Sequence, residues 1–180
     1  KGLAKSTIQR RCGRAKEFFA AAVKREIIAK SPFADMACAV PANADRFYFV
    51  SVDEIAKVMG ACPDAQWRLI FGLCRWAGLR CPSELMPLTW EDVNFESKTL
   101  TVKSPKTEHQ GKGARVVPIF PELYALLIEA FEQAQEGEPH LITRYRDSRS
   151  NLRTEAHRII KRAGIIPWPK TFQNLRSTRE

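Results

Sequence analysis

The sequence predicts a mainly helical α+β fold with a small antiparallel sheet, preceded by a separate helical segment. Apolar residues recur every three or four positions over most of the 180 residues, which is the spacing of amphipathic helices. Alternation with a period of two occurs between residues 99 and 119, where it predicts two strands. Residues 37–46 are rich in alanine and have no periodicity, as is typical of a linker. We therefore expect a helical segment at 1–36, a linker at 37–46 and the main domain at 47–180.

The charge of the chain is unevenly distributed. Residues 1–30 hold nine basic and two acidic residues, and residues 141–180 hold ten basic and three acidic residues. The intervening segment holds ten basic and fifteen acidic residues, within a formal net charge of +9. Basic segments on either side of an acidic body predict a polyanionic partner, because Lys and Arg bind phosphates and release counterions. The alternative is that these segments are ordinary solvated helix faces.

The cysteines and histidines do not indicate a metal site or a cofactor. The five cysteines include no C-x-x-C pair, and the three histidines lie at no metal-ligand spacing from them. We expect reduced thiols and a cytoplasmic protein with no membrane partner, because no signal peptide or membrane-spanning apolar run is present. The sequence begins without methionine, so we also expect a fragment of a longer protein.

Two of the predicted helices are amphipathic with a basic polar face. The first runs from Ser6 to Ala29, where Ser31-Pro32 ends it because the residue before proline disfavours helical geometry. Its polar face carries Arg10, Arg11, Arg14, Lys24 and Arg25. The second lies near residue 152 and ends at Gly164. Its polar face carries Arg149, Arg153, Arg158, Lys161 and Arg162.

The middle of the chain predicts three further helices and two strands. Ser51-Val-Asp-Glu54 is a capping box, so a helix starts at Val52 and runs to Gly60. A second helix, from about Asp64 to Ala77, is apolar around much of its circumference and should be central. The strands are expected at 99–103 and 114–119, joined by a ten-residue polar loop. A helix follows from Pro121 and is closed by Gly137, and another starts at Thr171.

One arginine lies at the edge of the predicted core. Arg80 follows the apolar run 67–76 in a Gly-Leu-Arg turn, and Glu84 follows it. A guanidinium held by core packing suits a phosphate, because its planar fork donates two parallel hydrogen bonds and stays charged. Glu84 could orient that fork, and the alternative is an ordinary Arg-Glu pair that only fixes geometry.

Three motifs stand in a fixed order. They are Ala77-Gly-Leu-Arg80 with Glu84 and Trp90-Glu-Asp92, then Lys106-Thr107 ahead of Arg115-Val-Val-Pro-Ile119, then Phe172-Gln-Asn-Leu-Arg176-Ser-Thr178. Each is weak alone, but their order and spacing resemble the tyrosine recombinases, the phage-integrase family of site-specific DNA recombinases. The resemblance covers residues 47–179, and the first basic helix is similar to the last helix of the family's SAM-like core-binding domain.

The resemblance implies a function and a set of site residues. Arg80 and Arg176 would clamp the scissile phosphate, and Lys106 would protonate the leaving 5′ hydroxyl, with Lys103 and Lys112 as the competing lysines. The partner would be double-stranded DNA, on which the parent protein would self-associate as a tetramer. The residues expected to contact DNA are Arg10, Arg11, Arg14, Lys24, Arg25, Arg149, Arg153, Lys161, Arg162, Lys112 and Arg115.

The sequence departs from the family pattern in three places. Gln173 occupies the usual histidine slot and Ser177 replaces the second histidine, so Gln173 can orient a phosphate but not exchange a proton. Glu84 follows Arg80 by four residues instead of three, which requires a local turn. The family's nucleophilic tyrosine follows the second arginine, whereas the tyrosines here all precede it. We therefore expect a fragment that binds DNA but lacks the nucleophile.

Two rival functions remain open at this stage. One is a DNA-binding protein without chemistry, which explains the charge but not the order of the three motifs. The other is a type IB topoisomerase, which has a similar catalytic set but forms no synapse. The tyrosines at 48, 124 and 145 and the four tryptophans are interpreted as structural residues, His109 as solvated, and His157 as part of the basic helix face.

Overall fold

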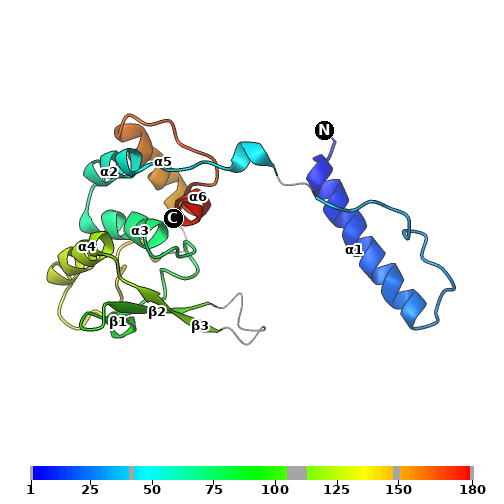
Figure 1. Ribbon diagram of the computed structural model, residues 1–180, viewed down its shortest axis with the longest axis horizontal. Coiled ribbons are helices and arrows are strands. Elements are labelled where there is room, and N and C mark those ends of the chain that lie inside the picture. The colour runs from blue at the N-terminus through cyan, green and yellow to red at the C-terminus, as the bar shows by residue number, and fades with distance from the viewer. Residues whose placement is uncertain (1, 41–42, 105–112, 148–150, 179–180) are drawn as a thin grey trace. The chain divides into compact units, whose positions relative to one another are not determined.

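The computed structural model describes residues 2–40, 43–104, 113–147 and 151–178, and the chain forms two compact units (Figure 1). Unit 1 comprises Lys1–Asp45 and unit 2 comprises Arg46–Glu180. The division lies within the segment that the sequence predicts as a linker. The predictions for Lys106, His109, Lys112 and Arg149 concern residues 105–112 and 148–150, which lie outside the described residues.

Unit 1 contains one long helix, α1, at Lys5–Lys24, none of whose residues is buried. The predicted end at Ala29 was wrong by five residues. Glu26 adopts a left-handed conformation with φ 58°, and the amides of Glu26 and Ile27 donate to the carbonyls of Val23 and Ala22 at 2.9 and 3.0 Å. This reversed pair of hydrogen bonds is a Schellman cap, which normally uses glycine. The sequence offers no glycine there, so the cap could not be predicted.

Unit 2 contains five α-helices and one short 3-10 helix among its described residues. The α-helices are α2 Val52–Gly60, α3 Ala65–Arg75, α4 Pro121–Glu132, α5 Leu152–Arg162 and α6 Thr171–Ser177. A 3-10 turn, η2, spans Trp90–Asp92, and another, η1, spans Ala44–Arg46 at the junction of the units. The capping box of α2 is present, because Ser51 Oγ accepts from the Glu54 amide and the Glu54 carboxylate accepts from the Ser51 amide. Its predicted bounds are confirmed.

Helix α3 is the centre of unit 2, as its all-round apolar character predicts. Every residue from Leu69 to Arg75 is buried, and α3 packs against both α4 and α6 (Figure 1). Gly72 permits the approach of α4, because a Cβ at that position would lie 2.5 Å from Leu126 Cδ1. The contact between α3 and α6 brings two distant parts of the sequence together.

A three-stranded antiparallel sheet packs beside the helices in the order β1-β2-β3 (Figure 1). The strands are β1 Val93–Asn94, β2 Thr99–Lys103 and β3 Ala114–Pro118. The predicted pair is confirmed, while β1 was missed because two residues cannot show alternation. Leu100 pairs with Val117 and Val102 pairs with Arg115, so all four belong to the same side of the sheet.

The remaining differences from the sequence-based expectations concern ends of elements. Helix α4 ends at Glu132, before Gly137, which has φ +81° in the following turn. Helix α5 is capped by the Asn151 side chain, which accepts from the Thr154 amide at 3.1 Å, and Gly164 follows it with φ +75°. Within the described residues, no helix has the length and apolar character needed to cross a membrane.

Candidate active site

A pocket of about 420 Å³ brings together three of the predicted catalytic residues, Arg80, Gln173 and Arg176. Arg80 lies in the turn that follows α3, and the other two lie on α6. Because α6 packs on α3, residues more than ninety positions apart in sequence line one cavity. The rest of the lining is Leu79, Cys81, Ser83 and Phe172. The pocket therefore presents two guanidiniums and one carboxamide to an incoming group.

Arg80 is held by Glu84, whose carboxylate is buried with 2% of the residue exposed. The Arg80 amide donates to Glu84 Oε2 at 2.9 Å, and the Arg80 guanidinium forms an ion pair with Oε1. The Glu84 amide in turn donates to the Arg80 carbonyl at 2.9 Å, which closes the turn between them. That turn contains a cis peptide bond between Cys81 and Pro82. The extra residue in this chain is thus accommodated by a turn, and the expected contact is present.

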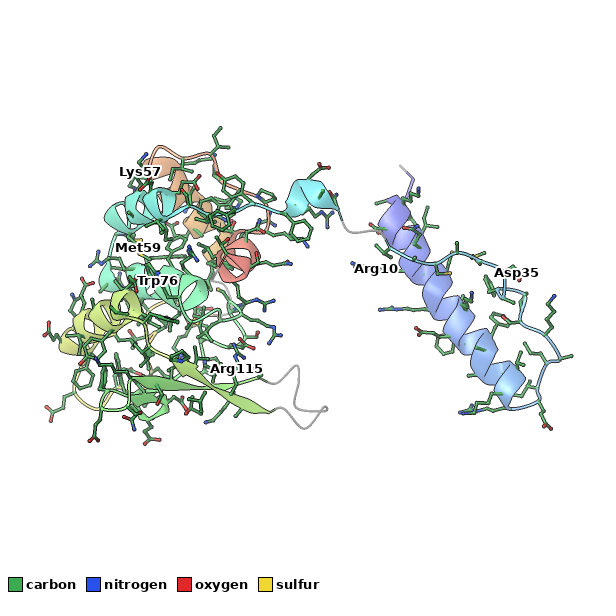
Figure 2. The ribbon with its side chains drawn as sticks, viewed as in Figure 1. Arg10, Asp35, Lys57, Met59, Trp76 and Arg115 are labelled. Carbon is green, nitrogen blue, oxygen red and sulfur yellow. The ribbon has the colours of Figure 1, made fainter. Side chains whose placement is uncertain are left out.

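The same carboxylate also receives donors from the sheet. Ser104 Oγ donates to Glu84 Oε1 at 2.9 Å, while Arg115 Nη1 and Nη2 donate to Oε1 and Oε2 at 3.0 and 2.8 Å. Arg115 Nη1 also donates to Ser104 Oγ at 2.5 Å. Arg115 projects from β3 toward the helical layer (Figure 2). The residue that sequence analysis grouped with the DNA contacts is therefore found on Glu84, and its contact with DNA stays a prediction.

The protonation state of Glu84 follows from these donors. Burial raises the pKa of Glu84. The hydrogen bonds from Arg115, the Arg80 amide and Ser104, together with the Arg115 charge, lower this pKa by more than burial raises it. The net result is a pKa of about 2. The carboxylate therefore remains ionised at any physiological pH and keeps its attraction for both arginines.

Arg176 and Gln173 are held differently. Gln173 is exposed and Arg176 is half-buried, and no described residue accepts a hydrogen bond from either side chain. Their position is fixed through α6 itself. Thr171 Oγ1 lies 2.8 Å from His157 Nε2 on α5, and Asn174 Nδ2 donates to the Arg46 carbonyl at 3.0 Å. The donors of both side chains are therefore available to an anion.

The C-terminal end of α6 is anchored by residues that sequence analysis did not select. Thr178 Oγ1 donates to the Asn174 carbonyl at 2.6 Å and accepts from the Val50 amide at 3.3 Å. The buried guanidinium of Arg75 on α3 donates to the Thr178 carbonyl. These contacts join α6 to α3 and to the start of unit 2.

The other predicted cationic residues are dispersed. On α1, Arg10, Arg11, Arg14 and Lys24 are exposed and Arg25 caps the helix. On α5, Arg153 and Lys161 are exposed, Arg158 pairs with Glu155 at 2.9 Å, and Arg162 donates to the Ala61 carbonyl at 3.2 Å. Lys103 is exposed, with Nζ 3.9 Å from Asp92 Oδ1. The structure thus brings the arginine pair together but does not place the lysine at 106.

None of the three tyrosines lines the arginine pocket. Tyr48 donates to Glu54 and stacks on Trp168 with 5.7 Å between ring centroids. Tyr145 donates to Asp64 Oδ2 at 2.7 Å, and Tyr124 packs edge-on against Phe95. Each has a structural role, as expected.

The remaining aromatic and imidazole predictions are mostly confirmed. Trp67 and Trp168 are buried, and Trp76 and Trp90 are half-buried against the core. His157 lies beside Arg153 and Lys161 on the basic face of α5, as predicted, and its ring also bonds Thr171 on α6, a contact that was not predicted.

Sequence analysis did not select Ser104 or His157, and it did not predict the contact of Arg115 with Glu84, although the sequence held a signal for part of this. Arg115, Val117 and Ile119 alternate with exposed residues, so the period-two pattern that predicted β3 also put Arg115 on the inner face. Ser104 directly follows β2 and is buried, but a serine beside a polar loop carries no such signal. His157 gave no signal either.

The buried Cys74 thiol is not activated. Burial raises the pKa of the Cys74 thiol well above its ordinary value, and the neighbouring Cys81 thiol raises it further. Among the described residues, no group of three or more His, Cys, Asp or Glu side chains could hold a metal ion. Arg80 and Arg176 line the pocket, so the chemistry that it offers is anion binding by two arginines.

The main domain is mostly helical and has a small antiparallel sheet. One arginine from the segment after α3 and one from helix α6 line the same pocket. Together these features define the class of the tyrosine-recombinase catalytic domain. The family model described as the phage integrase family matches residues 48–179. The match covers more than half of the chain, so the chain belongs to the phage integrase family.

A curated relative and several solved structures are similar to the chain. Tyrosine recombinase XerA of Pyrococcus horikoshii is 33% identical over 99 residues, which are 55% of this chain and 33% of that protein. The chain thus spans about a third of the length of this relative. A Tn1549 transposon integrase in complex with transposon right end DNA has a TM-score of 0.75 at 18% identity, covering 99% of this chain and 66% of that one. Lambda integrase residues 75–356 bound to DNA has a TM-score of 0.70 at 20% identity, covering 95% and 62%.

Proposed function

We propose that this chain belongs to a site-specific DNA recombinase and that the pocket of Arg80, Gln173 and Arg176 binds the scissile phosphate. The observation that carries the proposal is the convergence of two guanidiniums from separate elements on one pocket, with Arg80 fixed by a buried carboxylate. A phosphodiester in this pocket would receive planar donor pairs from both arginines.

The chemistry that such a pocket supports is phosphoryl transfer. Catalysis of this reaction consists mainly of positioning and of stabilising charge on the nonbridging oxygens, and two arginines supply both without a metal. The Gln173 carboxamide can donate to one nonbridging oxygen, but it cannot exchange a proton near neutral pH. Its proposed role is therefore orientation.

The proposed strand cleavage forms a 3′-phosphotyrosyl bond. The tyrosine oxygen attacks phosphorus, the bond from phosphorus to the 5′ oxygen breaks, and Lys106 gives a proton to that oxygen. The reverse attack by a 5′ hydroxyl rejoins DNA. Since Tyr48, Tyr124 and Tyr145 are engaged elsewhere, we propose that the nucleophile lies outside residues 1–180 and that this chain alone binds DNA without cleaving it.

The proposed partners are double-stranded DNA and further copies of the recombinase. The exposed arginines and lysines of α1 and α5 supply the charge for backbone contacts. Solved structures of similar fold contain DNA, and one is described as a lambda integrase tetramer bound to a Holliday junction. Acting on DNA, the protein would be found in the cytoplasm with the nucleoid.

The test is covalent trapping on a nicked DNA that carries the element's own attachment site. The full-length recombinase is expected to give a protein-DNA adduct, and Arg80→Ala and Arg176→Ala are each expected to slow its formation about 100-fold or more. Lys57→Ala on α2 (Figure 2) is the control for the loss of one positive charge, because Lys57 is not among the residues that line the pocket. Binding of DNA without any adduct would instead indicate a DNA-binding protein without chemistry. Relaxation of plasmids that lack the site would indicate a topoisomerase.

The lysine assignment has its own test. Lys106→Ala in the full-length recombinase is expected to lower the rate of cleavage while leaving the DNA dissociation constant unchanged, because the proton is needed only at the leaving oxygen. Lys103→Ala is the matched variant at the end of β2. If Lys103→Ala is the slower of the two, the role moves to Lys103.

A further inference from the structure

The position of Arg115 does not suit a DNA contact. Both terminal nitrogens of its guanidinium donate to the Glu84 carboxylate, and one also donates to Ser104 Oγ. A bidentate pair with a buried carboxylate is geometrically specific, and releasing the arginine to bind a phosphate would leave Glu84 with less compensation. Arg115 is paired with Val102 on the inner face of the sheet, and this position directs its side chain toward Glu84 and Ser104.

We infer that Arg115 is a positioning residue for the recombination reaction, which acts through Glu84 to hold Arg80 in the phosphate pocket. This inference rests on the proposed function for its catalytic consequence. Arg115 is thereby removed from the set of residues expected to contact DNA. It belongs instead to a cluster with Arg80, Glu84 and Ser104, in which Ser104 is the neutral member.

The cluster joins two elements through one carboxylate. Glu84 Oε2 accepts from the Arg80 amide and from Arg115 Nη2, while Oε1 accepts from the Arg80 guanidinium, Ser104 Oγ and Arg115 Nη1. The two oxygens cannot rotate to favour one arginine without losing bonds to the other. Arg115 thereby fixes the carboxylate orientation that Arg80 requires.

The sheet gives the cluster a rigid base. Arg115 pairs with Val102 in the register of β2 and β3, and the Ser104 amide donates to the Gly113 carbonyl at 2.7 Å. The inner neighbours Val102 and Val117 are buried. A guanidinium mounted on paired strands moves less than one on a loop, so it can serve as a reference point for the turn that carries Arg80.

The first part of the test separates a positioning role from a DNA contact. For the 180-residue chain, Arg115→Ala should leave the slope of log binding constant against log salt concentration unchanged. Arg153→Ala, which removes an equal charge from the exposed face of α5, should reduce that slope by about 1. A reduction of about 1 for Arg115→Ala would overturn the inference.

The second part measures the cluster directly and does not depend on cleavage. In NMR titrations of the 180-residue chain, Arg115→Ala should raise the pKa of Glu84 and shift the guanidinium signals of Arg80. Ser104→Ala, which keeps every charge, should do the same to a smaller extent, and it serves if Arg115→Ala does not fold. Unchanged Glu84 and Arg80 signals in both variants would overturn the inference even if the recombinase is active.

The third part concerns the rate. In the full-length recombinase, Arg115→Ala should slow adduct formation about 10- to 100-fold, as small misplacements of a reacting group do, with partial rescue by Arg115→Lys. It should also introduce a loss of rate at acidic pH, because the less tightly bound Glu84 protonates more readily. Wild-type rates and an unchanged pH profile would overturn the positioning role, whereas an inactive wild-type protein would overturn the proposed function alone.

Discussion

The two arginines of the pocket are held by different means. Arg80 is tied by its own amide and guanidinium to a buried carboxylate that also binds Arg115 and Ser104. Arg176 has no such partner among the described residues, and its position depends on α6. Hydrogen bonds of neutral side chains hold that helix at both ends, and the Arg75 guanidinium adds a hydrogen bond to the Thr178 carbonyl. One half of the pocket is thus held by ionic bonds, and the other half by backbone hydrogen bonds and packing.

This difference indicates a division of roles. Arg80 sits in a turn, which has little structure of its own, so a charged cluster fixes it. Arg176 sits on a helix that packs against α3 and α5, so its backbone is already rigid and its guanidinium can remain unpaired. Substitutions of charged groups should therefore affect the Arg80 side most, and substitutions of neutral groups should affect the Arg176 side.

The largest expected effect on stability is that of Glu84→Gln. It leaves two arginines around a neutral group, so the free energy of unfolding should fall by about 3 kcal/mol. Urea unfolding measures this change. Glu129→Gln is the matched control, because Glu129 pairs with Arg68 in a partly exposed ion pair, and it should cost less than about 1 kcal/mol. Equal effects of the two variants would contradict the ionic account of the Arg80 side.

The pH dependence of stability sharpens the same point. The pKa of Glu84 is lowered from 4.5 to about 2, so its contribution is complete above pH 4.5 and is lost as the pH falls through about 2. In that window its loss should reach at most about 1.4 kcal/mol per pH unit. The free energy of unfolding is measured from pH 5 to 2 for the wild type and for Glu84→Gln. The variant should lack the part of the pH dependence that is due to Glu84, and an identical profile in the two proteins would contradict the lowered pKa of Glu84.

A smaller effect is expected on the Arg176 side. Thr171→Val keeps the shape of a buried side chain but removes the hydroxyl that meets His157, so it should cost about 1 kcal/mol. Ser177→Ala on the exposed face of α6 is the control.

Burial lowers the pKa of His157, and the charges of Arg153 and Lys161 lower it further. Its contribution is therefore present above pH 6.5 and is lost as the pH falls through the lowered value, a component that His157→Gln should remove.

The smallest effect on stability is expected for Gln173→His, which introduces the residue usual in the family. Gln173 is exposed and has no described hydrogen-bond partner, so the free energy of unfolding should change by less than about 0.5 kcal/mol. The rate of adduct formation should gain a pH dependence near neutrality, because histidine exchanges a proton there. A flat profile would mean that this position does not reach the reacting oxygens.

Local signals predicted much of the fold. The capping box fixed the start of α2, and period-two alternation located β2 and β3. The order of three weak motifs resembles the tyrosine recombinases, and that resemblance implied that Arg80, Gln173 and Arg176 meet. What could not be predicted depends on tertiary contacts or on unusual backbone conformations, such as the cap at Glu26, the burial of Ser104 and the contact of His157 with Thr171.

The central claim is that Arg176 and Arg80 neutralise the scissile phosphate, and a charge-removal experiment tests it most directly. The rate of adduct formation is measured for wild-type recombinase and Arg176→Ala, on DNA with an ordinary scissile phosphate and on DNA in which a methyl group replaces one nonbridging oxygen. The account predicts a loss of about 100-fold or more for the variant on the ordinary phosphate and a much smaller gap on the neutral methylphosphonate. Equal rates of the two proteins on the ordinary phosphate, or the same gap on both substrates, would contradict it.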